Sequence, residues 1–94
     1  MTGPNHSAFE WDEAKRRKNI EKHGIDFVDA ALVLLDLTVD VPSGYAMEPR
    51  RKATGYWDEK LITVVYTLRE GKTRIISARR AWANEQRAYR ELYG

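Results

Sequence analysis

The feature that most constrains the fold is a run of strand-like segments in the C-terminal half of the chain, separated by two tight turns. The central segment, residues 60–69, is rich in Val, Ile, Tyr and Thr, which favour β-strands. Asp58-Glu59 and Glu70-Gly71 flank it, and two-residue connections are typical of β-hairpins. We therefore expect a three-stranded antiparallel meander formed by residues 50–57, 60–69 and 73–79.

The N-terminal half has helical patterns. Residues 13–23 are expected to form a first helix, because Asp12 is a suitable N-cap and Gly24 a suitable C-terminal stop. Asp26 is expected to cap a second, shorter helix whose apolar residues recur at helical spacing.

A short strand at residues 37–41 and a closing helix at residues 83–92 complete the predicted elements. Together they predict one α+β domain over residues 9–94, in which an antiparallel sheet of three to four strands carries two N-terminal helices and one C-terminal helix. Residues 1–8 are small and polar, so we expect them to form a flexible tail.

Composition excludes several classes of function. The chain has no cysteine, which excludes cysteine catalysis and thiolate metal sites and fits a reducing compartment such as the cytoplasm. It has no apolar run of about 18 residues, so no membrane span is expected. With two histidines and no glycine-rich phosphate loop, it shows no metal motif and predicts no nucleotide cofactor.

Charge is distributed unevenly along the chain. Residues 1–49 carry a net charge of −4 and residues 50–94 a net charge of +6, which indicates a polyanionic partner. With two tight turns, one face of the meander would be apolar and would pack against the helices. The other face would carry cations and threonines, which suits phosphate binding. The alternative is that this second face is an ordinary solvated surface. Regular alternation would place Arg79 on the apolar face. The expected basic face comprises Arg50, Lys52, Thr54, Thr63, Thr67, Arg69, Arg74 and Arg80.

Candidate groups for RNA cleavage can be named from their chemistry. Cleavage by the 2′-hydroxyl needs a base, an acid and cations, and no metal is required. His23 and Glu48 are the candidate proton carriers, with a tyrosine as a weaker alternative, and arginine suits phosphate because its fork binds two oxygens. Glu48 lies beside Arg50 at the start of the meander, which could equally be a surface ion pair. Lys15 shares a helix face with His23, which could equally be a solvated face.

Several sequence blocks, in order over about residues 9–90, resemble the BrnT toxin family. The first blocks are Phe9 to Asp12, then Lys15, Asn19 and Lys22 to Ile25, followed by Phe27, Ala30 and Ala31. The later blocks are Glu48 to Gly55, Val64 to Arg69 and Arg74 to Ala81, followed by Glu85 and Tyr89.

This resemblance implies a RelE-like fold and a ribonuclease toxin of a type II toxin–antitoxin system that blocks translation without a cofactor. It implies a cognate, BrnA-like, DNA-binding antitoxin, so that operator DNA is reached only through the antitoxin. The family's catalytic positions fall here on His23, Glu48, Arg50, Arg69 and Arg79. Candidate RNA contacts are Lys15, Lys52, Arg74, Arg80 and Tyr89.

Two functions follow as hypotheses. The first is a metal-independent endoribonuclease in which the arginines hold the scissile phosphate. The second is a non-catalytic module that uses the same basic face to bind nucleic acid or an antitoxin. RNA that is bound but never cut would distinguish the second from the first.

Overall fold

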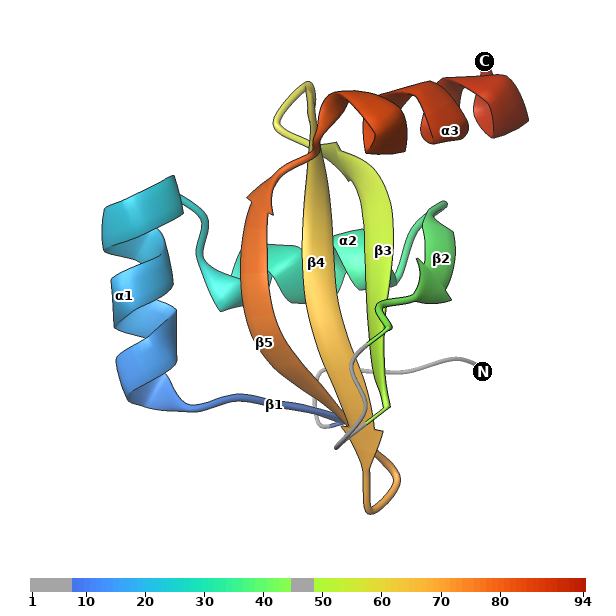
Figure 1. The fold of residues 1–94 in the computed structure, drawn as a ribbon. Helices are drawn as coiled ribbons and strands as arrows, with labels where there is room; N and C mark the ends of the chain where they lie inside the picture. Colours follow the sequence, from blue (N-terminus) through green and yellow to red (C-terminus); the bar gives the residue numbers. More distant parts are fainter. Residues whose placement is uncertain (1–7, 45–48) are drawn as a thin grey trace.

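The computed structural model describes residues 8–44 and 49–94 and confirms the α+β class. Three helices accompany a five-stranded mixed sheet of strand order β1-β5-β4-β3-β2 (Figure 1). None of the helices in the described residues is long and apolar enough to cross a membrane. The elements are β1 (Phe9–Glu10), α1 (Glu13–His23), α2 (Phe27–Leu34), β2 (Val39–Pro42), β3 (Arg50–Trp57), β4 (Lys60–Arg69), β5 (Lys72–Arg80) and α3 (Ala83–Tyr93).

The strand that the sequence did not predict is β1. It has two residues and pairs in parallel with β5, so that Phe9 lies opposite Thr73. The expectation of three to four antiparallel strands was therefore wrong, since two residues are too few to show the alternation by which a strand is recognised. Phe9 itself is buried in the core.

The predicted helix caps are confirmed. The Asp12 carboxylate accepts the backbone N–H groups of two residues in the first turn of α1, and Gly24 ends the helix at a φ of 71°. Asp26 caps α2 by accepting the Val28 N–H at 3.0 Å. The same carboxylate receives two hydrogen bonds from Arg16, at 2.8 and 3.0 Å, and thereby ties α1 to the start of α2.

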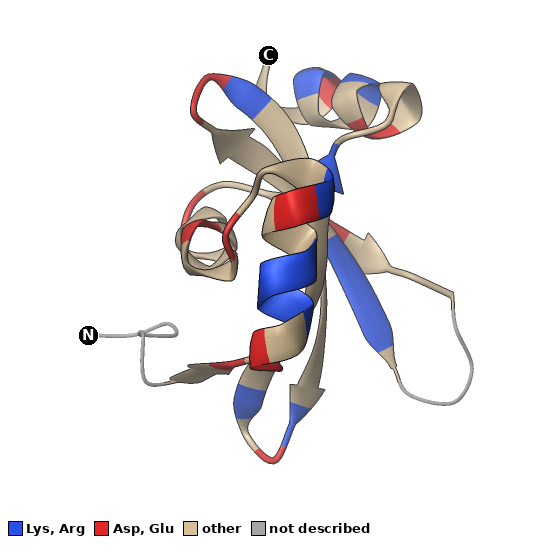
Figure 2. Cartoon of the chain, turned by 90° about the vertical axis from the view of Figure 1, so that its left-hand side faces the viewer, with Lys and Arg blue, Asp and Glu red and all other residues tan. Residues whose placement is uncertain are grey.

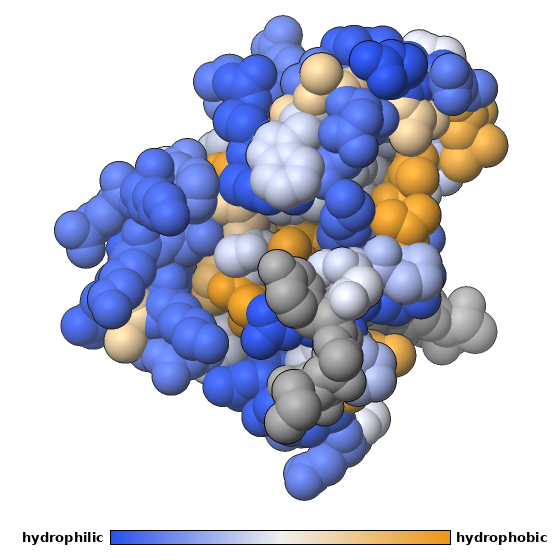
Figure 3. All heavy atoms as spheres, in the orientation of Figure 1, coloured by the Kyte–Doolittle hydropathy of each residue, from blue (hydrophilic) through white to orange (hydrophobic). Residues whose placement is uncertain are grey.

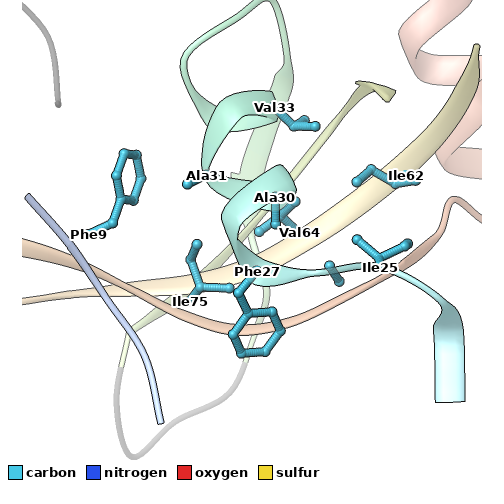
Figure 4. Close-up of a cluster of buried hydrophobic side chains, with 10 residues drawn as sticks. Phe9, Ile25, Phe27, Ala30, Ala31, Val33, Ile62, Val64 and Ile75 are labelled. Atoms are coloured by element: carbon cyan, nitrogen blue, oxygen red, sulfur yellow. The ribbon is translucent and has the colours of Figure 1, made fainter. Parts of the chain in front are cut away.

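The main core lies between α2 and one face of the sheet, the apolar face. Figure 4 shows Phe27, Ala30 and Val33 of α2 close to Ile62 and Ile75 of the sheet, as their buried cluster requires. In Figure 1 α2 lies behind the sheet, α1 lies beside β5, and α3 crosses the opposite face near the β3–β4 turn. The prediction that all helices pack on the apolar face was therefore wrong for α3.

The meander contains a β-bulge that changes which side chains share a face. Both tight turns form as predicted, but the pairing of β4 with β5 shifts at one point: Tyr66 pairs with Ile75 and Val65 with Ser77, which leaves Ile76 as the extra residue. Beyond it every side chain of β5 changes face. This shift decides the position of both arginines at the end of the strand.

Arg79 and Arg80 lie on the faces opposite to those predicted. Arg79 pairs with Thr63 and belongs to the basic face, and Arg80 pairs with Ile62 on the apolar side. The small side chain of Ala78 enters the core instead, where it is fully buried. The prediction assumed strict alternation, which a bulge interrupts.

Candidate functional site

The basic face is built from successive rows of paired residues across β3, β4 and β5. One row contains Arg50, Thr67 and Arg74, the next Lys52, Val65 and Ser77, and the third Thr54, Thr63 and Arg79. The rows are two residues apart along β3 and β4, which is about 7 Å, and on β5 the bulge adds one residue between Arg74 and Ser77. Figure 2 shows a continuous Lys and Arg stretch at the start of β3 and Asp residues in and beside α2.

Helix α3 brings a buried carboxylate onto this face. Glu85, which is 6% exposed, accepts two hydrogen bonds from the Arg79 guanidinium, at 2.8 and 3.0 Å. It also accepts Lys52 Nζ at 2.9 Å, Thr63 Oγ1 at 2.9 Å and the Trp82 backbone N–H at 2.8 Å. We call these five residues the Glu85 network; it fixes both cations and the start of α3.

The carboxylate of this network is ionised at every physiological pH. Burial opposes ionisation of Glu85, but the hydrogen bonds from Arg79, the Trp82 backbone and Lys52 outweigh it and lower the pKa to about 2. Glu85 therefore acts as a fixed negative charge that orients Arg79 and Lys52, and it cannot exchange protons near neutral pH.

A hollow of about 380 Å³ opens beside this network on the basic face. Figure 3 shows small hydrophobic areas on this side of the molecule, between hydrophilic side chains. Three cations and one indole border the hollow, and its apolar lining comes from β4 and from the bulge. Among the residues that the structure describes, the lining comprises Ser43, Arg50, Lys52, Val65, Ile76, Ser77, Arg79 and Trp82.

The C-terminal end of α1 is held next to this face by Asn19. Its Nδ2 donates to the carbonyl oxygens of Ile25, at 2.8 Å, and Ala78, at 2.9 Å, and its Oδ1 accepts the Ala78 N–H at 3.1 Å. His23 follows one turn later and is exposed. Partial burial, together with the charges of Lys22 and Arg79, lowers the His23 pKa, which favours the neutral imidazole near pH 7.

The structure brings together only some of the residues singled out in the sequence. Arg50, Lys52 and Arg79 share the hollow, and His23 lies close enough to Arg79 for its charge to act. Arg69 lies at the far end of β4, about 20 Å along the strand from the row of Arg79. It is not among the described residues that line the hollow.

Other candidates lie elsewhere. Glu48 falls outside the described residues. Lys15 is exposed on α1, and Arg74 pairs with Glu10 at 3.4 Å. Tyr89 is 7% exposed and packs with Tyr56 and Tyr93, with ring centroids at 5.2 and 4.8 Å.

Two of the predicted RNA contacts lie away from the hollow. Tyr89 is buried beside Tyr56 and Tyr93 and does not line the hollow, so its choice as an RNA contact stays a prediction. Arg80 lies on the other side of the sheet from the hollow, as the shifted register requires.

Sequence reasoning missed Glu85 and Trp82 as parts of the site. The sequence places Glu85 three residues after Trp82, at the start of a helix, and a carboxylate there often accepts a backbone N–H from the residue before the helix. That signal was available, but nothing in the sequence indicates that α3 lies on the basic face.

Chemically, the hollow suits a phosphate group. Among the described residues, three cations face one carboxylate, which leaves an excess of positive charge. The contacts of Arg79 with Glu85 and with the Arg80 carbonyl use three of its five N–H donors. Within residues 8–44 and 49–94, no cluster of three or more His, Cys, Asp or Glu is arranged to hold a metal ion.

Comparison with protein families gives a match over most of the chain. The family model described as "Ribonuclease toxin, BrnT, of type II toxin-antitoxin system" matches residues 11–85. The matched span begins just before α1 and ends at Glu85, so it contains His23 and the cations of the hollow. A comparison with curated proteins found no match.

Proposed function

The chain belongs to the BrnT family of ribonuclease toxins of type II toxin–antitoxin systems, and from this premise we propose that it is a metal-independent endoribonuclease. One observation supports the proposal above all: Arg50, Lys52 and Arg79 border a single hollow on one face of the sheet. A phosphodiester placed there would meet cations from two strands. A RelE-like fold stays a prediction of the resemblance.

The proposed reaction is an internal transesterification of RNA. The 2′-oxygen forms a bond to the adjacent phosphorus while the bond to the leaving 5′-oxygen breaks. A base removes the proton of the 2′-hydroxyl, and an acid protonates the leaving oxygen, which gives a 2′,3′-cyclic phosphate and a free 5′-hydroxyl. Fixed cations stabilise the transition state most strongly by binding the negative charge that develops on the phosphorane.

Each side chain takes a role that follows from its surroundings. Arg79 and Lys52 are held by Glu85 before substrate binds, so little reorganisation is needed to stabilise the transition state. Arg50 supplies a third cation from the neighbouring row. His23, neutral because of its lowered pKa, serves as the base.

The cellular consequences are part of the same proposal. RNA cleavage would stop translation in the cytoplasm. A BrnA-like antitoxin would neutralise the toxin, and operator DNA would be bound through that antitoxin. Glu48 stays a sequence prediction for the second proton carrier.

The test is cleavage of a labelled single-stranded RNA by the purified chain in the presence of EDTA. We expect Arg79→Ala and Arg50→Gln each to lower kcat/KM by about 100-fold or more, the scale on which loss of one transition-state contact is felt. Arg50→Gln is needed because Arg79→Ala also leaves the buried Glu85 without its main partner. Arg87→Ala, an exposed arginine on α3, is the matched control.

Three outcomes would contradict the proposal in different ways. Full activity of a folded Arg79→Ala chain would remove the role given to Arg79. Loss of all cleavage in EDTA would exclude the metal-independent mechanism. RNA that binds to the wild-type chain but is never cut would establish the non-catalytic binding module instead.

A further inference from the structure

The side chain of Trp82 is exposed at the border of the hollow. It is 57% exposed, whereas the other two tryptophans, Trp11 and Trp57, are partly buried and pack against the core. Single exposed apolar side chains are common on protein surfaces, but an aromatic ring beside cations offers a flat face on which a ligand can stack. Trp82 is one of the residues that line the hollow.

The indole is held in place although it is exposed. The Arg79 guanidinium carbon lies 3.7 Å from the ring centroid, which is the distance of a stacked cation–π contact, and Lys52 Nζ lies 5.5 Å from it. The backbone N–H of Trp82 is bonded to Glu85. The Glu85 network therefore fixes the ring before any ligand arrives.

The Arg79 guanidinium stacks on the ring, and the residue is still 57% exposed, so the indole has surface left for a ligand. A flat π-system next to three cations is the arrangement by which proteins bind single-stranded nucleic acid, in which bases stack on aromatic rings and cations follow the phosphates. In duplex RNA the bases are already stacked on one another and are not available to a side chain.

We infer that Trp82 is a stacking platform for an unpaired base next to the scissile phosphate, which makes single-stranded RNA the substrate class of this site. The inference rests on the proposed ribonuclease function, since it places the base beside the phosphate held by Arg79. RNA that stacks one base on this ring should bind about ten-fold more tightly than RNA without that base, which is near the lower end of what one stacked base contributes.

The test uses a short single-stranded oligonucleotide with 2′-O-methyl groups, which binds but lacks the attacking hydroxyl. A second probe of the same length has no bases at its central nucleotides. We measure dissociation constants for both probes by fluorescence anisotropy, for the wild-type chain, Trp82→Ala, Trp82→Phe and the control Leu92→Ala, an exposed apolar residue on α3. Circular dichroism checks that each variant is folded.

Stacking predicts a specific pattern. Removing the bases should weaken binding to the wild-type chain by about ten-fold and should change binding to Trp82→Ala very little. Trp82→Phe should keep most of the preference for the intact probe, and Leu92→Ala should behave as the wild type. A duplex probe should bind equally to the wild type and Trp82→Ala.

Other results would overturn the inference. If Trp82 served only to position Arg79, Trp82→Ala would weaken binding to both probes by the same factor. If the indole were covered by a partner polypeptide, all variants would bind both probes as the wild type does. A wild-type chain that neither binds nor cuts RNA would instead overturn the proposed function, so the two failures can be distinguished.

Discussion

Replacing Glu85 by glutamine should destabilise the fold by about 3 kcal/mol at pH 7. The side chain keeps its shape but loses the charge that pairs with Arg79 and Lys52 inside the protein. The magnitude follows from the pKa of Glu85, which falls from 4.5 to about 2 in the folded chain, because each unit corresponds to about 1.4 kcal/mol. Removal of one partner of a buried ion pair costs about 3–5 kcal/mol, which agrees with this value.

The dependence on pH has a definite sign. A carboxyl whose pKa is lowered by folding stabilises the native state above its unfolded pKa of about 4.5, and this contribution is lost as the pH falls towards about 2. The difference in stability between the wild type and Glu85→Gln should therefore fall to less than half of its neutral value by about pH 3.

Urea unfolding at a series of pH values measures this difference. With a slope of about 1.5 kcal/mol per M, the midpoint at pH 7 should fall by about 2 M. Glu91→Gln, an exposed carboxyl on the same helix, should leave the midpoint almost unchanged. A loss of less than about 1 kcal/mol for Glu85→Gln, or a loss that is the same at pH 3 and pH 7, would refute the account of the Glu85 network.

Three further predictions concern the framework and the chemistry. Asn19→Ala should cost about 2–4 kcal/mol in urea unfolding, because it leaves both backbone groups of Ala78 without their partner, while the exposed Asn84→Ala should cost little. Gly55→Ala should cost about 1–3 kcal/mol, since the added Cβ would meet a backbone oxygen and a valine methyl at 3.0 Å, and an unchanged melting temperature would show that this contact is relaxed. The pH profile of cleavage should rise to a plateau below the ordinary histidine pKa of about 6.5, and His23→Gln should remove this limb. An unchanged limb in the variant would show that another group is the base.

The local elements could be predicted because their signals are local. Asp12 and Asp26 cap helices by binding N–H groups two or three residues away, and Gly24 adopts a φ that few other residues accept. The turn at Glu70-Gly71 likewise depends only on its own residues. These features need no knowledge of the tertiary structure, and the predicted bounds of β3 and β4 agree with those observed.

The composition of the site could not be predicted in the same way, because it depends on contacts between distant segments. Glu85 and Lys52 are 33 residues apart, and they meet only because α3 turns back across the sheet. The predicted basic face contained no acid, but the folded one contains a buried carboxylate. The threonines that suggested an open, hydroxyl-lined surface are buried instead, with Thr63 bonded to Glu85 and Thr54.

The bulge at Ile76 has a cause that can be stated in terms of burial. With regular pairing, β5 would turn Ser77 and Arg79 towards the apolar core, where an arginine without a carboxylate partner costs several kcal/mol. The extra residue sends Ala78 into the core in their place, and Arg79 reaches Glu85 on the other side of the sheet. Strict alternation along β5 would bury a serine and an arginine, and this pattern in the sequence therefore indicates a bulge. The arginine that the bulge turns to the other face, Arg79, is the one on which the proposed chemistry depends.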